Sequence, residues 1–474
     1  MILISLLCLN QHFVRAQCYS IYDLLSLGHH TNNAQISSIE KQINEFDNKL
    51  FKIQVLPQIQ MSATLPCLTN SISPIVISDG SEKFVNRFYM TSALSLGVSQ
   101  LVPFTGGTLS LTSELVRLDN FAPQRTKSYN LNIFNLSYSQ SISSFNPYKW
   151  EKKSIYKQNE IFSKSQLQKV ENNNLMIVEL FFDLLIAQKR EELNTILAEN
   201  AKLIHEKAKA LFSQGRMSQV DYMDTVLGLL QFRNSTAHLE TIKHQNNLIS
   251  KLKLENVSPT VYFNYDDIDD ITISFDIDEV LDRVVRYSIQ HEHELDKIEE
   301  DMEIQKIKSS RLPSISISLG GGYNSHNEDF RKLSISPSRN FSAIVSVEIP
   351  ILTWGENRIL LKRAEESIKI SELNYRNNID DLVSSSRYEL TSLPLLLESI
   401  IISKTTLTVL YSQLHELTSQ YDAGRISYTR IHDLQSEIIQ EELSRLLNIK
   451  KLYTIQYKYR AMSLYDVLHN IYLY

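Results

Sequence analysis

Two windows of the chain alternate hydrophobic and polar residues, and this period of two predicts β-strands. In residues 313–319 isoleucine and leucine alternate with serine, and residues 342–349 repeat the pattern. Residues 94–99 and 109–112 show it in the first window. Each strand is therefore expected to have one apolar face and one face rich in hydroxyl groups. This alternation is typical of an antiparallel sheet with a solvated face, and equally of a membrane barrel around a water-filled interior.

The rest of the chain predicts unusually long helices. Residues 148–256 contain no proline and two glycines, and residues 356–474 contain one of each. From Tyr148 to about Ser213 one helix of about 65 residues is predicted, which is roughly 100 Å long at 1.5 Å per residue. Leucine and isoleucine recur in these stretches at heptad spacing, so packing against other helices is the expected role of nearly all of them.

A turn with the sequence Gly-Arg-x-Ser is predicted to end each long helix. It occurs in residues 212–221 and again in residues 421–430. The glycine supplies the left-handed residue that closes a helix, and the serine caps the helix that follows. The residues with these roles are Gly215, Ser218, Gly424 and Ser427. Each long helix is therefore expected to turn back as a hairpin.

The repeated turn indicates an internal duplication. Gly424 lies 209 positions after Gly215, and aligning the strand ends at Gln140 and Glu348 requires a shift of 208. Two independent markers thus agree on one duplication. The chain is predicted to contain two copies of one elongated unit rather than two or three compact domains.

Composition and charge narrow the classes of function. The 474 residues include 48 basic and 54 acidic ones, a net charge of −6, which argues against a protein that binds nucleic acid. No run approaches the 18 or so apolar residues that a membrane-spanning helix needs. The best candidate, residues 175–187, is short and carries two acidic side chains.

The N-terminus is typical of an export signal. Residues 1–9 form an apolar core ahead of a plausible cleavage site, and a buried N-terminal helix is the alternative. Removal of residues 1–17 would leave Cys18 and Cys67, which are too few for a disulfide framework. Residues 15–17 form a poor lipobox, which disfavours acylation of Cys18 without deciding the matter.

The sequence shows no catalytic, metal or cofactor site. His291 and His293 lie two residues apart, so on a helix they point about 200° from each other and cannot chelate one metal ion together. Residues 266–270 include four aspartates, but they lack the glycine and the ligand spacing of a calcium loop. A solvated acidic linker is therefore favoured there. We expect that the protein is not an enzyme and that it has no cofactor.

The motifs and their order resemble the TolC-type outer membrane efflux proteins, also called the outer membrane factor family. A Leu-Pro pair at Leu56 and another at Leu312 open the strand regions, and residues 345–355 pass from a strand into a helix. Gly355-Glu-Asn-Arg and the paired turns complete a resemblance that covers essentially the whole mature chain. Residues 143–150, the matching segment of the first repeat, depart from this glycine pattern.

The resemblance implies a mainly α fold with antiparallel β structure and an internal duplication. Long coiled-coil-like helices would form a trimeric α-barrel continuous with a membrane β-barrel. The expected parts are a signal peptide (1–17), a first repeat (18–260), an equatorial linker (257–277) and a second repeat (278–474). The first repeat has an N-terminal helix, strands at about 56–142 and a tunnel hairpin at about 148–256 with its tip at 213–221. The second has a helix, strands at about 312–353, a hairpin at about 355–461 with its tip at 421–433, and a C-terminal equatorial segment.

One chain has only four to six predicted strands, whereas a barrel needs about eight, so three chains are expected to close it. Strands at 92–102 and 107–117 form an extra hairpin in the first window. The sequence leaves open whether this hairpin lies in the barrel or in a loop.

By the same resemblance, the protein is expected to be the outer membrane channel, or exit duct, of a tripartite efflux or type I secretion system. It would extend into the periplasm and conduct cargo passively. The implied partners are two further copies in a homotrimer, a periplasmic adaptor, an inner-membrane transporter of the RND or ABC type, and outer-membrane lipid. The cargo and the pump stay open. An exported coiled-coil scaffold or tether without a channel is the alternative, and it explains the heptads but not the alternating strands.

The resemblance places the functional residues at the two hairpin tips. The residues of the periplasmic gate, or entrance, are Asp221, Asp224, Tyr421, Arg430 and Asp433. Arg430 stands where an acidic residue is common, which weakens an acidic ring and would reduce cation selectivity. The residues of the adaptor-contacting tip are Gly215, Arg216, Ser218, Gly424, Arg425 and Ser427. For any single position, a solvated hairpin residue without such a role is the alternative.

Overall fold

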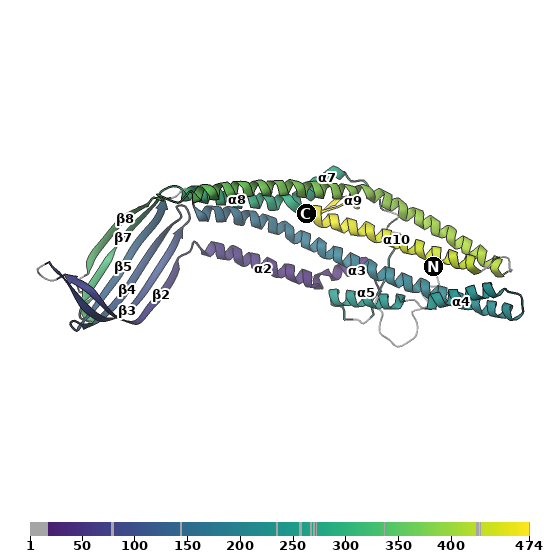
Figure 1. Cartoon of the computed structure of the whole chain (residues 1–474), viewed down its shortest axis with the longest axis horizontal. Helices are drawn as coiled ribbons and strands as arrows, with labels where there is room; N and C mark the ends of the chain where they lie inside the picture. Colours follow the sequence, from purple (N-terminus) through teal and green to yellow (C-terminus); the bar gives the residue numbers. More distant parts are fainter. Residues whose placement is uncertain are drawn as a thin grey trace. The chain divides into compact units, whose positions relative to one another are not determined.

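The computed structural model describes residues 18–76, 80–142, 145–233, 236–255, 258–265, 268, 271, 273–335, 337–422, 426 and 428–473. The predicted signal peptide therefore lies outside the described residues. The chain is mainly helical with an antiparallel sheet (Figure 1), which confirms the predicted mainly α fold with antiparallel β structure. It divides into two units. The first unit comprises residues up to 41, 160–293 and 374–474, and the second comprises residues 42–159 and 294–373.

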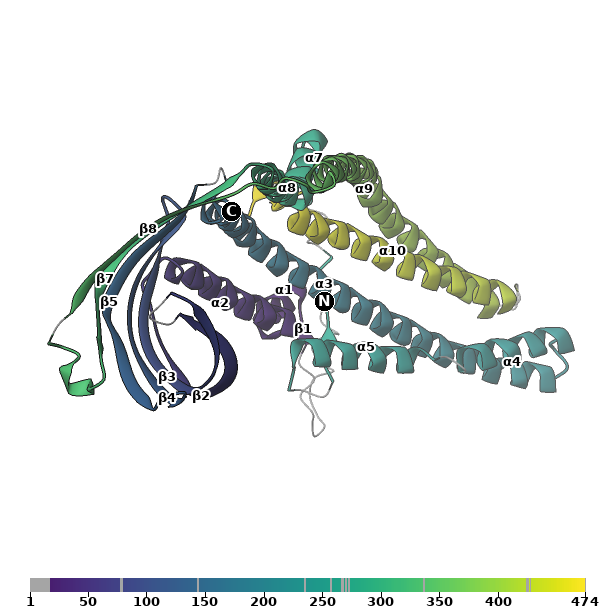
Figure 2. The same cartoon turned by 60° about the vertical axis from the view of Figure 1, so that its left-hand side comes forward.

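The second unit contains an antiparallel sheet of six strands in the order β2-β3-β4-β5-β7-β8. Figure 2 shows that this sheet is strongly curved. Its strands are β2 (Gln58–Val76), β3 (Glu82–Val102), β4 (Gly107–Ala122), β5 (Thr126–Ile142), β7 (Ser314–Asn327) and β8 (Ser338–Glu348). The extra hairpin of the first window is β3 and β4, and it lies inside the sheet between β2 and β5.

The register of the sheet keeps its two faces chemically distinct. Val98 of β3 pairs with Leu111 of β4, which pairs in turn with Leu136 of β5. In the next row three serines pair in the same way, namely Ser99, Ser110 and Ser137. Because paired residues point to the same side of a sheet, the rows build one apolar face and one face of hydroxyl and amide groups.

Helices make up most of the rest of the described chain. The first repeat has α1 (Ile21–Ser26), the 3-10 turn η1 (Leu27–His30), α2 (Asn32–Ile53), α3 (Pro147–Ser213), α4 (Gln219–Arg233) and α5 (Ala237–Leu252). The second has α7 (Ile277–Val285), α8 (His291–Ser310), α9 (Glu356–Asp422) and α10 (Tyr428–Ser463). Both α3 and α9 contain 67 residues, and they begin 209 positions apart. This equals the offset between the paired turn glycines.

The helix predicted to open the second repeat is less regular than the sequence pattern indicates. It contains a π-helical turn at Arg286–Gln290, between α7 and α8. Heptad spacing does not reveal this turn, because no glycine or proline marks it and a local change of helical pitch leaves the composition unchanged.

The helix that best fits a membrane span by hydropathy is not the one expected from the sequence. Among the described helices, the stretch Glu356–Tyr421 of α9 is long and apolar enough to cross a membrane by length and composition alone. Apolar runs in the sequence instead favour residues 175–187 as the best candidate. The difference arises because the α9 window tolerates serine and threonine within an apolar average, whereas a search for unbroken apolar runs passes over it. One such helix is weak evidence for a membrane span.

The core of the first unit joins helices that are far apart in sequence. Phe181 and Phe182 of α3 pack with Tyr453 and Tyr459 of α10, and Leu24 of α1 is also fully buried there. The ring centroids of Phe182 and Tyr453 lie 5.3 Å apart. The core therefore ties the N-terminal helix and the last helix to the middle of α3.

A buried ion network fixes the end of α10 to α3. The Arg460 guanidinium donates to both carboxylate oxygens of Glu171, at 2.7 and 3.2 Å, and to Asp466 Oδ2 at 2.7 Å. Gln456 Nε2 donates to both oxygens of Asp466, at 2.9 and 3.0 Å. Burial by itself would raise the pKa of Asp466, but the hydrogen bond from Gln456 and the charges of His469 and Arg460 hold this pKa below its usual value.

We predict that Asp466→Asn lowers the stability of the fold by about 3 kcal/mol, because it leaves the half-buried Arg460 with one fewer counter-charge. A lowered pKa stabilises the fold above the unfolded-state pKa of 3.8, and this contribution is lost as the pH falls through the lowered value. Thermal unfolding of parent and variant should therefore differ most at neutral pH and converge below about pH 4. A difference that does not change with pH would contradict this account.

Candidate functional site at the hairpin tips

The tip of the first hairpin is closed by backbone geometry. Gly215 has φ +72°, the left-handed region that favours glycine. The backbone N–H of Gly215 donates to the Phe212 carbonyl and that of Arg216 to the Leu211 carbonyl, both at 2.9 Å. These bonds satisfy carbonyl groups at the end of α3. Arg216 is exposed, and its side chain is accessible at the end of the hairpin.

The cap of α4 explains where Asp221 points. The Asp221 backbone N–H donates to Ser218 Oγ at 3.1 Å, and the Ser218 hydroxyl donates to Asp221 Oδ2 at 2.6 Å. Behind this cap the rings of Phe212 and Tyr222 stack with their centroids 4.8 Å apart. Asp221 is therefore engaged within its own turn.

The second tip is described in part. Gly424, Arg425 and Ser427 lie outside the described residues. Tyr421 is half-buried at the end of α9, and Arg430 is exposed in the first turn of α10. Asp433 is also exposed, and its carboxylate lies 3.9 Å from His432 Nδ1, an ion pair only when that histidine is protonated.

A hydrogen bond joins the two hairpins. The Thr429 hydroxyl at the start of α10 donates to Asp224 Oδ2 on α4 at 3.0 Å. Asp224 and Asp433 occupy equivalent places in the two repeats, but Asp224 is the one that this bond connects to the other hairpin. Sequence analysis missed Thr429, because the position carries Val220 in the first repeat and a single threonine beside a turn is no signal.

Apolar packing lies above each tip. Leu407 and Leu410 of α9 pack with Leu434 and Ile438 of α10. In the first hairpin, Leu197 and Ala201 of α3 are buried together with neighbours that include Leu229 and Ile439. On the outside of α4 a row of apolar side chains at heptad spacing is exposed instead, namely Val220, Met223, Leu227 and Leu230. The hairpins are thus held together by apolar contacts, and one face of α4 carries exposed apolar side chains.

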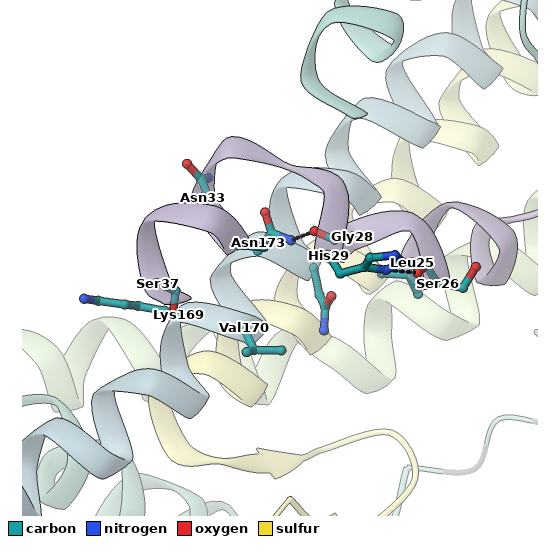
Figure 3. Close-up of a pocket in the computed structure, with 11 residues that line it drawn as sticks. Leu25, Ser26, Gly28, His29, Asn33, Ser37, Lys169, Val170 and Asn173 are labelled. Carbon is teal, nitrogen blue, oxygen red and sulfur yellow. Dashed lines mark hydrogen bonds between the residues drawn. The ribbon is translucent and has the colours of Figure 1, made fainter. Parts of the chain in front are cut away.

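A pocket of 260 Å³ lies elsewhere in the first unit, where the N-terminal helices meet α3 (Figure 3). The Asn173 side-chain amide donates to the Gly28 carbonyl at 3.0 Å, and the Thr31 hydroxyl donates to Asn173 Oδ1 at 2.8 Å. His29 Nδ1 lies 2.8 Å from the Ser26 carbonyl oxygen. These polar groups are paired with each other, so the arrangement attaches the N-terminal segment to α3 rather than offering a ligand site.

The histidine pair is also engaged in separate contacts. The ring of His293 stacks on Tyr375 at 3.7 Å, whereas Nε2 of His291 lies 3.1 Å from Lys164 Nζ. Within the described ranges, no group of three or more histidine, cysteine or acidic side chains is arranged to hold a metal ion. The aspartates of residues 266–270 lie outside those ranges.

Comparison with known proteins gives one family match. Residues 290–457 match the model of the outer membrane efflux protein family. No curated protein sequence matches the chain.

Solved structures extend the likeness to nearly the whole chain. CusC is 14% identical with a TM-score of 0.65, covering 96% of this chain and 95% of CusC. A membrane protein from Pseudomonas aeruginosa is 13% identical with a TM-score of 0.67, covering 93% of this chain and 92% of that one. The CmeC outer membrane channel of Campylobacter jejuni is 14% identical with a TM-score of 0.62, covering 93% and 85%. At these identities the likeness concerns the fold.

We predict that Asp224 and Thr429 are energetically coupled. Asp224→Ala and Thr429→Val should each destabilise the tip, and the double variant should lose about 1 kcal/mol less than the sum, because both remove one hydrogen bond to a charged group. Chemical unfolding of the four proteins measures this coupling. Thr418→Val is the matched control, because the Thr418 hydroxyl donates within its own helix to the Leu414 carbonyl. Additive effects of Asp224→Ala and Thr429→Val would contradict the coupling.

Proposed function

We propose that the chain is an outer membrane efflux protein of the TolC type, located in the outer membrane and extending into the periplasm, and that it is the exit duct of a tripartite efflux or type I secretion system. Cargo would pass through it from the periplasm to the exterior without an energy source of its own. The inner-membrane transporter, of the RND or ABC type, would select and drive the cargo.

The observation that carries this proposal is the two-faced sheet. Its apolar face is fit to contact lipid, and its face of hydroxyl and amide groups is fit to line water, as in outer-membrane barrels. The apolar side chains at the sheet edges are exposed in the single chain, among them Ile59, Met61 and Val345. A soluble scaffold would need to cover such a surface.

Closure of the sheet supports a homotrimer. Among the described residues, each of the edge strands β2 and β8 pairs with a strand on one side only, and nearly all their residues are exposed. Pairing β8 of one copy with β2 of the next removes both open edges. On α2 the apolar residues are also exposed and follow heptad spacing, namely Ile36, Ile39, Ile43, Phe46, Leu50 and Ile53. We call this row the α2 seam, and we propose that it packs against a neighbouring copy.

The tips would form the periplasmic gate. In our proposal Thr429 and Asp224 hold the two hairpins of one copy together, and Asp221, Tyr421, Arg430 and Asp433 surround the opening. The adaptor would contact the ends of the turns, at Gly215, Arg216, Ser218, Gly424, Arg425 and Ser427. The exposed apolar row on α4 supports a helical partner near the tip, because coiled-coil packing covers side chains at this spacing.

We predict that the mature protein is recovered by detergent from a washed outer-membrane fraction with a native mass three times that of one chain. Three copies are expected because the sheet of one copy cannot close. Mass photometry or light scattering of the extract measures this. A soluble periplasmic dimer would instead support the coiled-coil tether and overturn the channel.

We predict that opening the tip raises passive leak. Cells with Thr429→Val or Asp224→Ala should take up large antibiotics about fivefold faster, the factor that corresponds to 1 kcal/mol of lost closure. Uptake is measured in cells without the pump and with matched amounts of outer-membrane protein. Thr418→Val should leave the leak unchanged. Equal uptake by all the variants would contradict the gate assignment while leaving the trimeric channel intact.

A further inference from the structure

The β3–β4 hairpin determines how many strands each copy can contribute to a membrane barrel. We propose that each copy contributes all six strands of its sheet to the wall, so that the trimer encloses an 18-stranded barrel. This rests on the proposed trimeric channel. The consequence is a wide, polar outer conduit that admits bulky hydrated cargo, with the selective constriction elsewhere along the duct.

The pairing of the hairpin is continuous on both sides. β3 pairs with β2 from Gln58↔Ser99 to Val76↔Glu82, and β4 pairs with β5 from Thr108↔Ser139 to Asn120↔Thr126. A loop folded outside the wall would leave β2 paired directly with β5. No such pairing exists among the described residues, so removing the hairpin would break the sheet in two.

The turn of the hairpin is held by the strand beside it. Gly106 has φ +77°, and its N–H donates to the Val102 carbonyl at 2.8 Å. The Gln140 side-chain amide donates to the Thr105 carbonyl at 2.9 Å, and the hydroxyl groups of Thr105 and Tyr138 are 2.9 Å apart. Residues of β5 therefore fix the turn at the level where β5 leads toward α3.

The hairpin also carries the same apolar band as its neighbours. On the apolar face, Leu94 of β3 pairs with Leu115 of β4, and Leu115 pairs with Leu131 of β5. Beyond this row the face becomes charged, because Arg117 Nε lies 2.7 Å from Asp119 Oδ2. The apolar face of β5 extends from Leu131 to Ile142 at the other end of the strand. In a strand tilted by about 40°, this stretch covers a height of about 28 Å along the barrel axis, close to the thickness of a hydrocarbon layer.

Eighteen strands give a wide opening. At about 4.8 Å between strands and a tilt of about 40°, the backbone ring is about 36 Å in diameter, within the size class that leaves an aqueous channel. The polar face in this band is rich in serine, threonine and asparagine, and charged side chains such as Glu114 and Glu348 are few. Such a lining favours hydrated solutes and discriminates little by charge.

Site-directed spin labelling tests whether the hairpin faces lipid. In a background with Cys8, Cys18 and Cys67 replaced by serine, single cysteines are introduced in β4 and, as matched controls, in β7. The four variants are Leu111→Cys, Ser110→Cys, Ile317→Cys and Ser316→Cys. Each is labelled with a nitroxide in liposomes, and its accessibility to oxygen, which partitions into lipid, is compared with that to a water-soluble nickel chelate.

We expect the labels at Leu111 and Ile317 to collide mainly with oxygen, and those at Ser110 and Ser316 mainly with the nickel chelate. If Ile317 faces lipid but Leu111 does not, the barrel exists without the hairpin and the inference is overturned. If neither faces lipid, the channel proposal itself fails.

Electron cryomicroscopy of the unmodified trimer provides a measurement that needs no substitution. A cross-section of the membrane part with 18 strands supports the inference, and one with 12 strands, four from each copy, overturns it.

Discussion

The structure depends on one constraint, that a backbone N–H or C=O group in a hydrocarbon layer must have a hydrogen-bond partner. Within the sheet the ladder supplies these partners, but β2 and β8 each present a row without one. β2 is 19 residues long, and Ile59 and Ile72 on it are each 74% exposed. An edge that is long, apolar and unpaired is stable in a membrane only when another strand covers it. In the proposed channel, assembly with further copies is therefore a condition for the β section rather than an addition to it.

One helix also exposes apolar side chains that a partner would cover. α2 has no buried residue in the single chain, although its apolar side chains follow a heptad pattern. Each Å² of apolar surface that is buried contributes roughly 25 cal/mol of favourable free energy, so packing against another helix along this row would be favourable. The central part of the first unit differs, because Phe181, Phe182 and Tyr459 are fully buried within one chain. One copy thus supplies its own core there, and in the proposed trimer its edges would be covered by neighbouring copies.

The stabilising interactions are also unequal along the hairpins. Arg460, Glu171 and Asp466 form a network that is mostly buried, and such charges are costly to separate. Among the described residues of the tip, an exposed hydrogen bond between Thr429 and Asp224 joins the hairpins. An exposed bond of this kind contributes about 1 kcal/mol. A partner that binds separated hairpin tips more tightly than joined ones can therefore shift the equilibrium toward separation. This difference fits the gate proposed above, which would be stiff at its base and weakly closed at its end.

The sequence by itself determined the elements whose signals are local. Alternation of isoleucine with serine predicted the strands, scarcity of glycine and proline predicted long helices, and two turn glycines gave the repeat offset of 209 that α3 and α9 follow. The gate and adaptor residues remain predictions. The tertiary structure alone placed the β3–β4 hairpin inside the sheet, because strand neighbours are decided by pairing across the fold and not by the alternation within a strand. It also brought Thr429 to Asp224, a contact across 205 positions that no local pattern encodes.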